Sequence, residues 1–173
     1  MRVINRRNIS MGLAALVSSG AMVGISAMPA EASTRTCNGT ISNRSIDDNI
    51  RVRPGATCII NRSTIDGNIS VGANATLRVN RSTVDGNIES NNHKWVIVNN
   101  STVDGNIKLQ RGQSTTLTAN RVDGNIELLR NRGRQAVSTN RVDGNLKCSS
   151  NRNAITGGRN VVDGNKEGQC RRL

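Results

Sequence analysis

Apolar and polar residues alternate in short runs along most of this chain. In residues 68–87 the apolar positions form three such runs, which are Ile69 and Val71, then Leu77 and Val79, then Val84. Alternation with a period of two is typical of a β-strand with one buried face. No segment after residue 32 shows the competing 3.6-residue period of a helix. The pattern therefore predicts three short strands per segment of this length and an all-β fold.

A five-residue motif, Val-Asp-Gly-Asn-Ile with small variations, recurs at nearly constant spacing. Its Asn occupies seven positions, with four steps of 19 residues followed by two of 20: Asn49, Asn68, Asn87, Asn106, Asn125, Asn145 and Asn165. A fixed period of this size indicates one coil per repeat. The sequence thus predicts a single-domain solenoid of about seven coils over residues 33–173. Inward aliphatic side chains would stack at the strand spacing of about 4.8 Å.

The motif itself predicts a bend with a ladder of amides. Stacked Asn side chains can hydrogen-bond to their neighbours above and below, so we expect the seven Asn residues to form a structural ladder. The preceding Asp-Gly suits a bend, because Gly takes backbone angles closed to other residues and Asp can bond to the local backbone. The extra residue of the two longer coils is expected near Gly133 and near Gly157–Gly158.

From Cys37 to the C-terminus, the coil length, the aliphatic columns and the Asn ladder are similar to those of small parallel β-helix proteins that bacteria secrete. The resemblance implies a right-handed parallel β-helix. The left-handed hexapeptide helix is the alternative, but it would show a strong six-residue repeat, and none is visible.

The first 32 residues are predicted to be an export signal. Three arginines precede a weakly apolar stretch at 11–28, and Ala30-Glu31-Ala32 supplies small residues around a cleavage site. We expect cleavage after Ala32, with a membrane anchor as the alternative for the apolar stretch. Residues 5–9 resemble a twin-arginine leader, which would imply export in a folded state. The prediction is a protein at the cell envelope or secreted, with no transmembrane segment after cleavage.

Four cysteines on an exported chain predict two disulfides, which three connectivities could satisfy. Cys37 and Cys58 lie 21 residues apart, and Cys148 and Cys170 lie 22 apart, which in each case is about one coil. Every other pairing would join coils several layers apart. We therefore expect these two bonds to close the ends of the array, each contributing about 3 kcal/mol in the chain-entropy model.

The charge of the chain is strongly positive. Removing Arg2, Arg6, Arg7 and Glu31 from the 24 basic and 12 acidic residues leaves 21 and 11, a net charge of +10. Such a field favours anionic partners: acidic polysaccharide, teichoic acid or another cell-wall polymer, lipid headgroups, and nucleic acid only non-specifically. The alternative is a solvated basic surface that keeps the protein soluble. Phe and Tyr are absent and Trp95 is the only aromatic residue, so the core must be aliphatic and thin.

The Asp of each motif would stack like charges along one edge of the solenoid: Asp47, Asp66, Asp85, Asp104, Asp123, Asp143 and Asp163. A basic residue lies an even number of positions upstream in four coils, at Arg62, Arg81, Arg121 and Arg141. Even spacing on a strand places both side chains on one face, which predicts alternating Arg and Asp ladders. Calcium bridging the carboxylates is the sharper alternative.

Candidate catalytic groups are few. His93 is the only histidine, and no Ser or Cys motif frames it, so we expect an exposed loop residue. The cysteines lack the close paired spacing of a zinc site. The sequence therefore predicts no cofactor.

The leading hypothesis is a non-catalytic, exported β-helix that acts as a structural or adhesive module and binds anionic polymers. The expected contacts are the arginines of the ladders and a cluster towards the C-terminus: Arg130, Arg132, Arg134, Arg152 and Arg159. The oligomeric state is left open.

Two other functions remain alternatives. The first is a polysaccharide-active enzyme similar to β-helix lyases, which use acidic residues for calcium and a basic residue as proton acceptor. Coils of 19 or 20 residues leave little loop to wall a cleft, which disfavours it. The second is ice binding by a stacked column of Thr64, Thr83 and Thr102, which Arg121 and Arg141 interrupt in the following coils.

Overall fold

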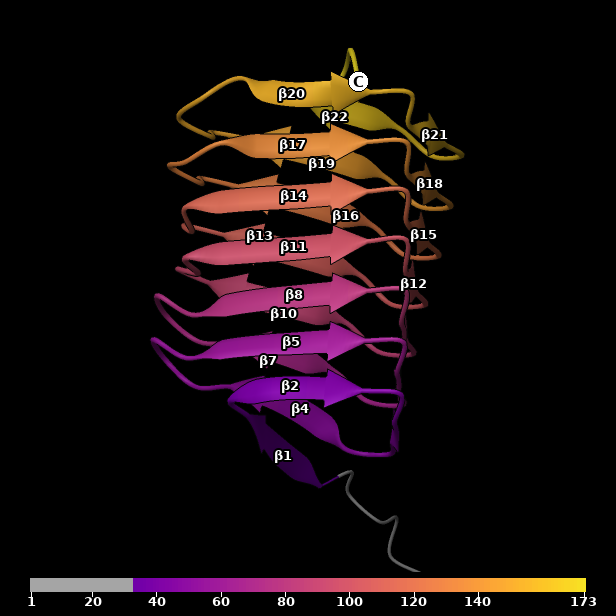
Figure 1. Cartoon of the computed structure of the whole chain (residues 1–173). Coiled ribbons are helices and arrows are strands. Elements are labelled where there is room, and N and C mark those ends of the chain that lie inside the picture. The colour runs from indigo at the N-terminus through magenta and orange to yellow at the C-terminus, as the bar shows by residue number, and fades with distance from the viewer. Residues whose placement is uncertain (1–32) are drawn as a thin grey trace, which may run out of the picture. The chain divides into compact units, whose positions relative to one another are not determined.

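The computed structural model describes residues 33–173, so the predicted export signal lies outside the described residues. This part of the chain forms strands β1 to β22, stacked in three parallel sheets (Figure 1), and no helix in it is long and apolar enough to cross a membrane. Sheet A contains β1 (Thr34–Cys37), β4 (Asn49–Val52), β7 (Ile69–Val71), β10 (Ile88–Asn91), β13 (Ile107–Gln110), β16 (Ile126–Leu129), β19 (Leu146–Ser149) and β22 (Lys166–Gly168).

Sheets B and C complete the three sides of each coil. Sheet B, the front sheet in Figure 1, contains β2 (Gly39–Ser42), β5 (Thr57–Asn61), β8 (Thr76–Asn80), β11 (Trp95–Asn99), β14 (Ser114–Thr118), β17 (Gln135–Ser138) and β20 (Ile155–Gly158). Sheet C contains β3 (Ser45–Ile46), β6 (Thr64–Ile65), β9 (Thr83–Val84), β12 (Thr102–Val103), β15 (Arg121–Val122), β18 (Arg141–Val142) and β21 (Val161–Val162).

Each strand pairs in parallel with the equivalent strand of the next coil, so residues one repeat apart lie directly above one another. On sheet A the register joins the predicted column Ile50, Ile69, Ile88, Ile107 and Ile126. These side chains are fully buried, and the core consists of such aliphatic columns. The all-β class and the parallel solenoid of about seven coils are confirmed. The right-handed sense stays a prediction of the resemblance.

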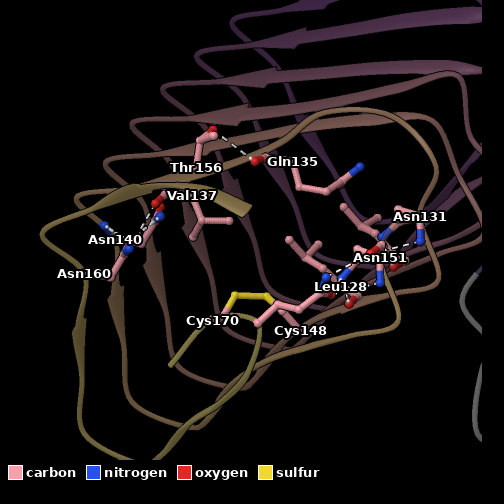
Figure 2. The surroundings of a disulfide bond; sticks show 12 residues. Leu128, Asn131, Gln135, Val137, Asn140, Cys148, Asn151, Thr156, Asn160 and Cys170 are labelled. Atoms are coloured by element: carbon pink, nitrogen blue, oxygen red, sulfur yellow. Dashed lines mark hydrogen bonds between the residues drawn. A yellow bond between two sulfur atoms is a disulfide. The ribbon is translucent and has the colours of Figure 1, made fainter. Parts of the chain in front are cut away.

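Both predicted disulfides are present, and they lie at the two ends of the solenoid. Cys37 bonds to Cys58 with their Cα atoms 5.5 Å apart, and Cys148 bonds to Cys170 at 5.2 Å. All four residues are buried. Figure 2 shows the second bond inside the coil, between Asn131 and Asn151 on one side and Asn140 and Asn160 on the other.

The predicted Asn ladder forms the edge between sheets C and A, called here the Asp-Gly-Asn edge. At Asn106, for example, the backbone N–H donates to Oδ1 of Asn87 at 2.8 Å, and Nδ2 donates to the same oxygen at 3.0 Å. The backbone bond repeats from Asn68 to Asn165 at 2.8 to 2.9 Å. Each amide therefore fixes the chain of the coil that follows.

The glycine of the motif has a different role from the one expected. The motif does not require glycine for its backbone angles, because no glycine of the motif has a positive φ in the described chain. The glycines with positive φ all lie outside the motif: Gly39, Gly55, Gly157, Gly158 and Gly168. A Cβ at Gly105 would instead lie 2.7 Å from Oδ1 of Asn87 and 2.7 Å from the carbonyl carbon and oxygen of Gly86. The ladder amide of one coil therefore fills the space of the side chain in the next.

The single departure from glycine at this position of the motif fits this explanation. Asp48 occupies the glycine position of the first coil, where no earlier motif lies beneath it in the described chain. Its carboxylate accepts a hydrogen bond from the Ser33 hydroxyl, and the Asn49 N–H donates to the Ser33 carbonyl at 2.8 Å. A side chain is thus accommodated only where no ladder amide precedes it.

Single left-handed residues make the turn between sheets B and C, called here the B–C corner. Their φ values lie between 48° and 58°, at Asn43, Arg62, Arg81, Asn100, Ala119, Thr139 and Arg159. From Arg62 onward the next residue is buried and polar: Ser63, Ser82, Ser101, Asn120, Asn140 and Asn160. Each of the first five donates its backbone N–H to the side-chain oxygen of the one above, at 3.0 to 3.2 Å. Sequence analysis missed this second, buried ladder.

The extra residue of the longer coils is placed correctly near Gly133 and wrongly near Gly157–Gly158. The Gly112 N–H donates to the side chain of Asn131, 19 residues later, whereas the Gly133 N–H bonds to Gln113, 20 residues earlier. The insertion therefore lies beside Arg132, and the following coil keeps the same offset. Gly157 and Gly158 belong to β20 and not to a bend.

We expect Gly105→Ala to destabilise the protein by about 1 to 3 kcal/mol, because the new methyl group would meet backbone atoms that cannot move aside. The control is Asp48→Ala at the equivalent position of the first coil, which should cost less than about 1 kcal/mol. Urea unfolding followed by circular dichroism measures both. Equal losses would show that the ladder does not select the glycine.

We expect Ala119→Gly to raise the free energy of unfolding by about 0.5 to 1 kcal/mol, since Ala119 has a φ of 55° that disfavours any Cβ. Ala136→Gly, in extended strand β17, should lower the free energy of unfolding. At an extended position Gly relieves no strain, and it loses more backbone entropy on folding than Ala does. Melting temperatures of the two variants provide the test. A decrease for both would contradict the corner assignment.

Candidate polyanion-binding surface

Acidic residues are confined to one part of the solenoid. Every Asp and Glu of residues 33–173 lies on the Asp-Gly-Asn edge or on the outer face of sheet A. On that face one outward column alternates in sign, with successive paired residues Glu89, Lys108, Glu127, Lys147 and Glu167. Lys147 Nζ lies 3.7 Å from Glu167 Oε2. Sheet A therefore has little net charge of its own.

The opposite part of the molecule is called here the basic side, and it comprises sheet B with its two flanking corners. Its twelve basic residues are Arg44, Arg53, Arg62, Arg78, Arg81, Lys94, Arg111, Arg130, Arg132, Arg134, Arg152 and Arg159. All are exposed, and no Asp or Glu lies among them. The rest of residues 33–173 holds the other nine basic residues and all 11 acidic ones, a balance of −2. The whole net positive charge is thus on one side.

The structure brings together most of the arginine cluster predicted from the sequence. Arg130, Arg132, Arg134 and Arg152 all lie between sheets A and B, called here the A–B corner. Arg53, Lys94 and Arg111 extend the same corner into earlier coils, and sequence analysis had left them out. Arg159 does not join this cluster. It lies at the B–C corner, where its left-handed conformation equals that of Arg62 and Arg81.

The predicted Arg–Asp ladder exists in two of the four coils for which it was predicted. Arg121 contacts Asp123 at 3.0 Å and Asp143 at 2.7 Å, and Arg141 contacts Asp143 at 3.5 Å and Asp163 at 2.8 Å. These side chains are between 32% and 53% exposed, so the pairs contribute little stability.

Arg62 and Arg81 form no ion pair within the part of the chain that the structure describes, which contradicts the ladder there. Both are left-handed corner residues, so the rule that even spacing puts residues on one face of a strand does not apply to them. In the first coils the Asp column is therefore without arginine partners. Desolvation and, to a smaller extent, the negative charges of Asp47 and Asp85 raise the pKa of Asp66. The pKa of Asp104 is raised in the same way, by desolvation and by the charges of Asp85 and Asp123.

The prediction that His93 is exposed is wrong. Its side chain is fully buried at the A–B corner, and Nε2 lies 3.2 Å from Thr115 Oγ1, while Nδ1 has no hydrogen-bond partner in the described chain. The imidazole occupies the space that a side chain of Gly112 would fill in the next coil, because a Cβ there would lie 2.1 Å from the ring. Burial lowers the pKa of His93 to about 4. The signal in the sequence was Gly112, the small residue 19 positions after His93.

The surface of the solenoid has several open depressions. One of about 710 Å3 lies over the first coils of sheet A, lined by Asn49, Arg51, Ser70 and Glu89 among others. Two more lie on sheet B and share Arg78 and Ile97. Within residues 33–173 no group of three or more His, Cys, Asp or Glu side chains is placed to hold a metal ion. The column Thr64, Thr83 and Thr102 is in register on sheet C and continues into Arg121, as expected.

Comparisons of the chain with protein-family models, with curated proteins and with solved structures find no significant match. The two disulfides are compatible with an extracellular protein.

We expect stability to fall as the pH drops from 6.5 towards 4, because the folded-state pKa of His93 is lowered to about 4 and the unfolded chain binds the proton more tightly. The full contribution, about 3 kcal/mol, is present above pH 6.5 and is lost once the pH reaches the folded pKa. His93→Asn, which matches Asn131 in the same column, should remove this dependence. Urea unfolding between pH 4 and 8 measures it, and parallel profiles for both proteins would contradict a buried neutral His93.

Proposed function

We propose that this protein is a non-catalytic, exported module that binds anionic polymers through its basic side. The observation that carries the proposal is the segregation of charge: twelve exposed basic residues and no acidic residue on sheet B and its corners, against a balance of −2 elsewhere. A surface of one sign concentrates counter-ions and attracts extended anions. A basic surface kept only for solubility would not need to exclude every carboxylate from one side.

The spacing of the cations favours a polymer over a small anion. At the A–B corner, equivalent positions of successive coils carry Arg111 and Arg130, and coils stack at about 4.8 Å. The basic residues thus follow the axis of the solenoid as a row instead of converging on one point. A small ligand would contact one or two of them, whereas a chain lying along the axis would contact many. Each contact releases counter-ions, so affinity should fall steeply with salt.

The backbone that presents these residues is rigid. Both corners are bonded coil to coil: the Arg111 N–H donates to the Leu129 carbonyl at 3.0 Å, and the Arg81 N–H donates to the Asn99 carbonyl at 3.1 Å. Binding would therefore order side chains but not backbone, which limits its entropic cost. A module of this kind suits an exported protein that holds an acidic polysaccharide or cell-wall polymer at the cell envelope or outside the cell.

We expect the protein to be retained on heparin and on teichoic acid, with an affinity that decreases with salt and without cleavage of the polymer. Neutralising Arg130, Arg132 and Arg134 together to Gln should lower the salt concentration of elution and reduce the slope of log affinity against log salt by up to about three. The matched control removes the same charge from sheet A, as Arg51→Gln, Lys108→Gln and Lys147→Gln, and should change both quantities much less.

Three results would contradict the proposal. Equal effects of the two triple variants would mean that only net charge matters. Retention no stronger than that of an unrelated protein of equal charge would mean that the basic side only keeps the protein soluble. Accumulation of unsaturated oligosaccharides in the presence of calcium would replace binding by the lyase alternative.

A further inference from the structure

Trp95, the only aromatic residue of the chain, lies on the outer face of the basic side. It begins strand β11, its side chain is 46% exposed, and it is one of two exposed large apolar residues in the described chain, with Val161 on sheet C. Nearly half of the indole surface is in contact with water in the free protein, and the aliphatic core of this solenoid contains no Phe, Tyr or Trp. Its position therefore calls for an explanation outside the core.

The neighbours of Trp95 in its own column are small. It pairs with Thr76 of the preceding coil and with Ser114 of the next one, so no large side chain stands beside the ring along that column. Ile97, two residues later on the same face, is half-buried beside it. The indole and Ile97 thus form a small apolar platform on the outer face of sheet B.

Two arginines lie at opposite ends of this platform. A depression of about 420 Å3 is lined by Arg78, Trp95, Ile97 and Arg134, together with Ser114, Thr116 and Ala136. Arg78 pairs with Ile97 from the preceding coil, and Arg134 lies two coils beyond Trp95, where its carbonyl accepts a hydrogen bond from the Thr115 N–H. A second depression, of about 390 Å3, shares Arg78 and Ile97 and continues to Thr40. Together they form a shallow strip that runs across the strands of sheet B.

We propose that Trp95 is a sugar-stacking subsite, and that the polymer bound by this protein is an acidic polysaccharide that carries carboxylates, such as a polyuronate. The inference rests on the proposed function and narrows its ligand class. The apolar C–H face of a sugar ring covers the indole, and its neighbours along the chain direct carboxylates to Arg78 on one side and Arg134 on the other. The bidentate guanidinium suits a planar carboxylate.

Other polyanions use this arrangement less well. A polyphosphate or teichoic acid backbone of phosphodiesters gains from the arginines alone and leaves the indole exposed. A single-stranded nucleic acid could stack one base on Trp95, but such binding usually uses several aromatic side chains for successive bases, and this chain has only one aromatic residue. The pairing of one apolar platform with flanking cations therefore favours the acidic polysaccharide.

The experiment uses the fluorescence of the protein, because with no Tyr and a single Trp all of it arises from Trp95. Polygalacturonate should change the emission maximum of the wild-type protein, whereas long-chain polyphosphate should bind without changing it. Trp95→Ala should weaken polygalacturonate binding at least about fivefold, the effect of losing about 1 kcal/mol of apolar contact, and polyphosphate binding by less than twofold. Trp95→Phe should restore part of the loss.

Val161→Ala, which removes the other exposed apolar side chain, is the matched control and should leave both affinities unchanged. Equal losses of both polymers in Trp95→Ala, or an unchanged emission with polygalacturonate bound, would overturn the subsite. A loss confined to single-stranded DNA would assign Trp95 to base stacking and overturn it as well. If the wild-type protein bound neither polygalacturonate nor polyphosphate, the proposed function would itself fail, which is distinct from a failure of Trp95 alone.

Discussion

The structure depends on one constraint, the in-register stacking of coils. Because residues one repeat apart lie directly above one another at about 4.8 Å, each side chain has its own equivalent as its nearest neighbour. A column is therefore stable only if its residue type is compatible with copies of itself. Aliphatic side chains meet this condition by packing, and amides and hydroxyls meet it because each offers both a donor and an acceptor. Charged side chains do not meet it, and each charged column needs a separate solution.

The same constraint explains why some features could be predicted from the sequence. Columns that repeat identically, such as Ile50 to Ile126 and the Asn of the motif, are visible as a period. The disulfides followed from the same period, since one coil brings Cys37 beside Cys58. Features that depend on a contact between different residue types in adjacent coils were not visible. The imidazole of His93 fits only because Gly112 in the next coil has no side chain. In the same way, the Asn of each motif leaves room only for glycine in the motif of the next coil. Even spacing misled at Arg62, because a left-handed corner separates it from strand β6.

The charged columns differ in how they meet the stacking constraint. Sheet A alternates Glu and Lys, so each charge has an opposite neighbour. The last coils of the Asp-Gly-Asn edge place Arg121 and Arg141 between carboxylates, whereas in the first coils the carboxylates stand together and the pKa of Asp66 is raised. The basic side has no compensation within the described chain, although its columns place Arg111 over Arg130. Like charges directly opposite one another are destabilising. A bound polyanion would relieve this repulsion, which supports the proposal that the basic side binds one.

The division between inner and outer columns lets the protein carry such a surface with little loss of stability. Burial and coil-to-coil hydrogen bonds are supplied by inward residues: the aliphatic columns, the Ser and Asn ladder at the B–C corner, and the amides that flank Cys148. Outward positions carry little of the stability, so they can hold uncompensated arginines and an exposed tryptophan at low cost. Each additional coil extends both corners by one rung, and contacts with a linear polymer increase with the number of rungs. The two disulfides lie at the ends of this array, where a coil has a neighbour on one side only.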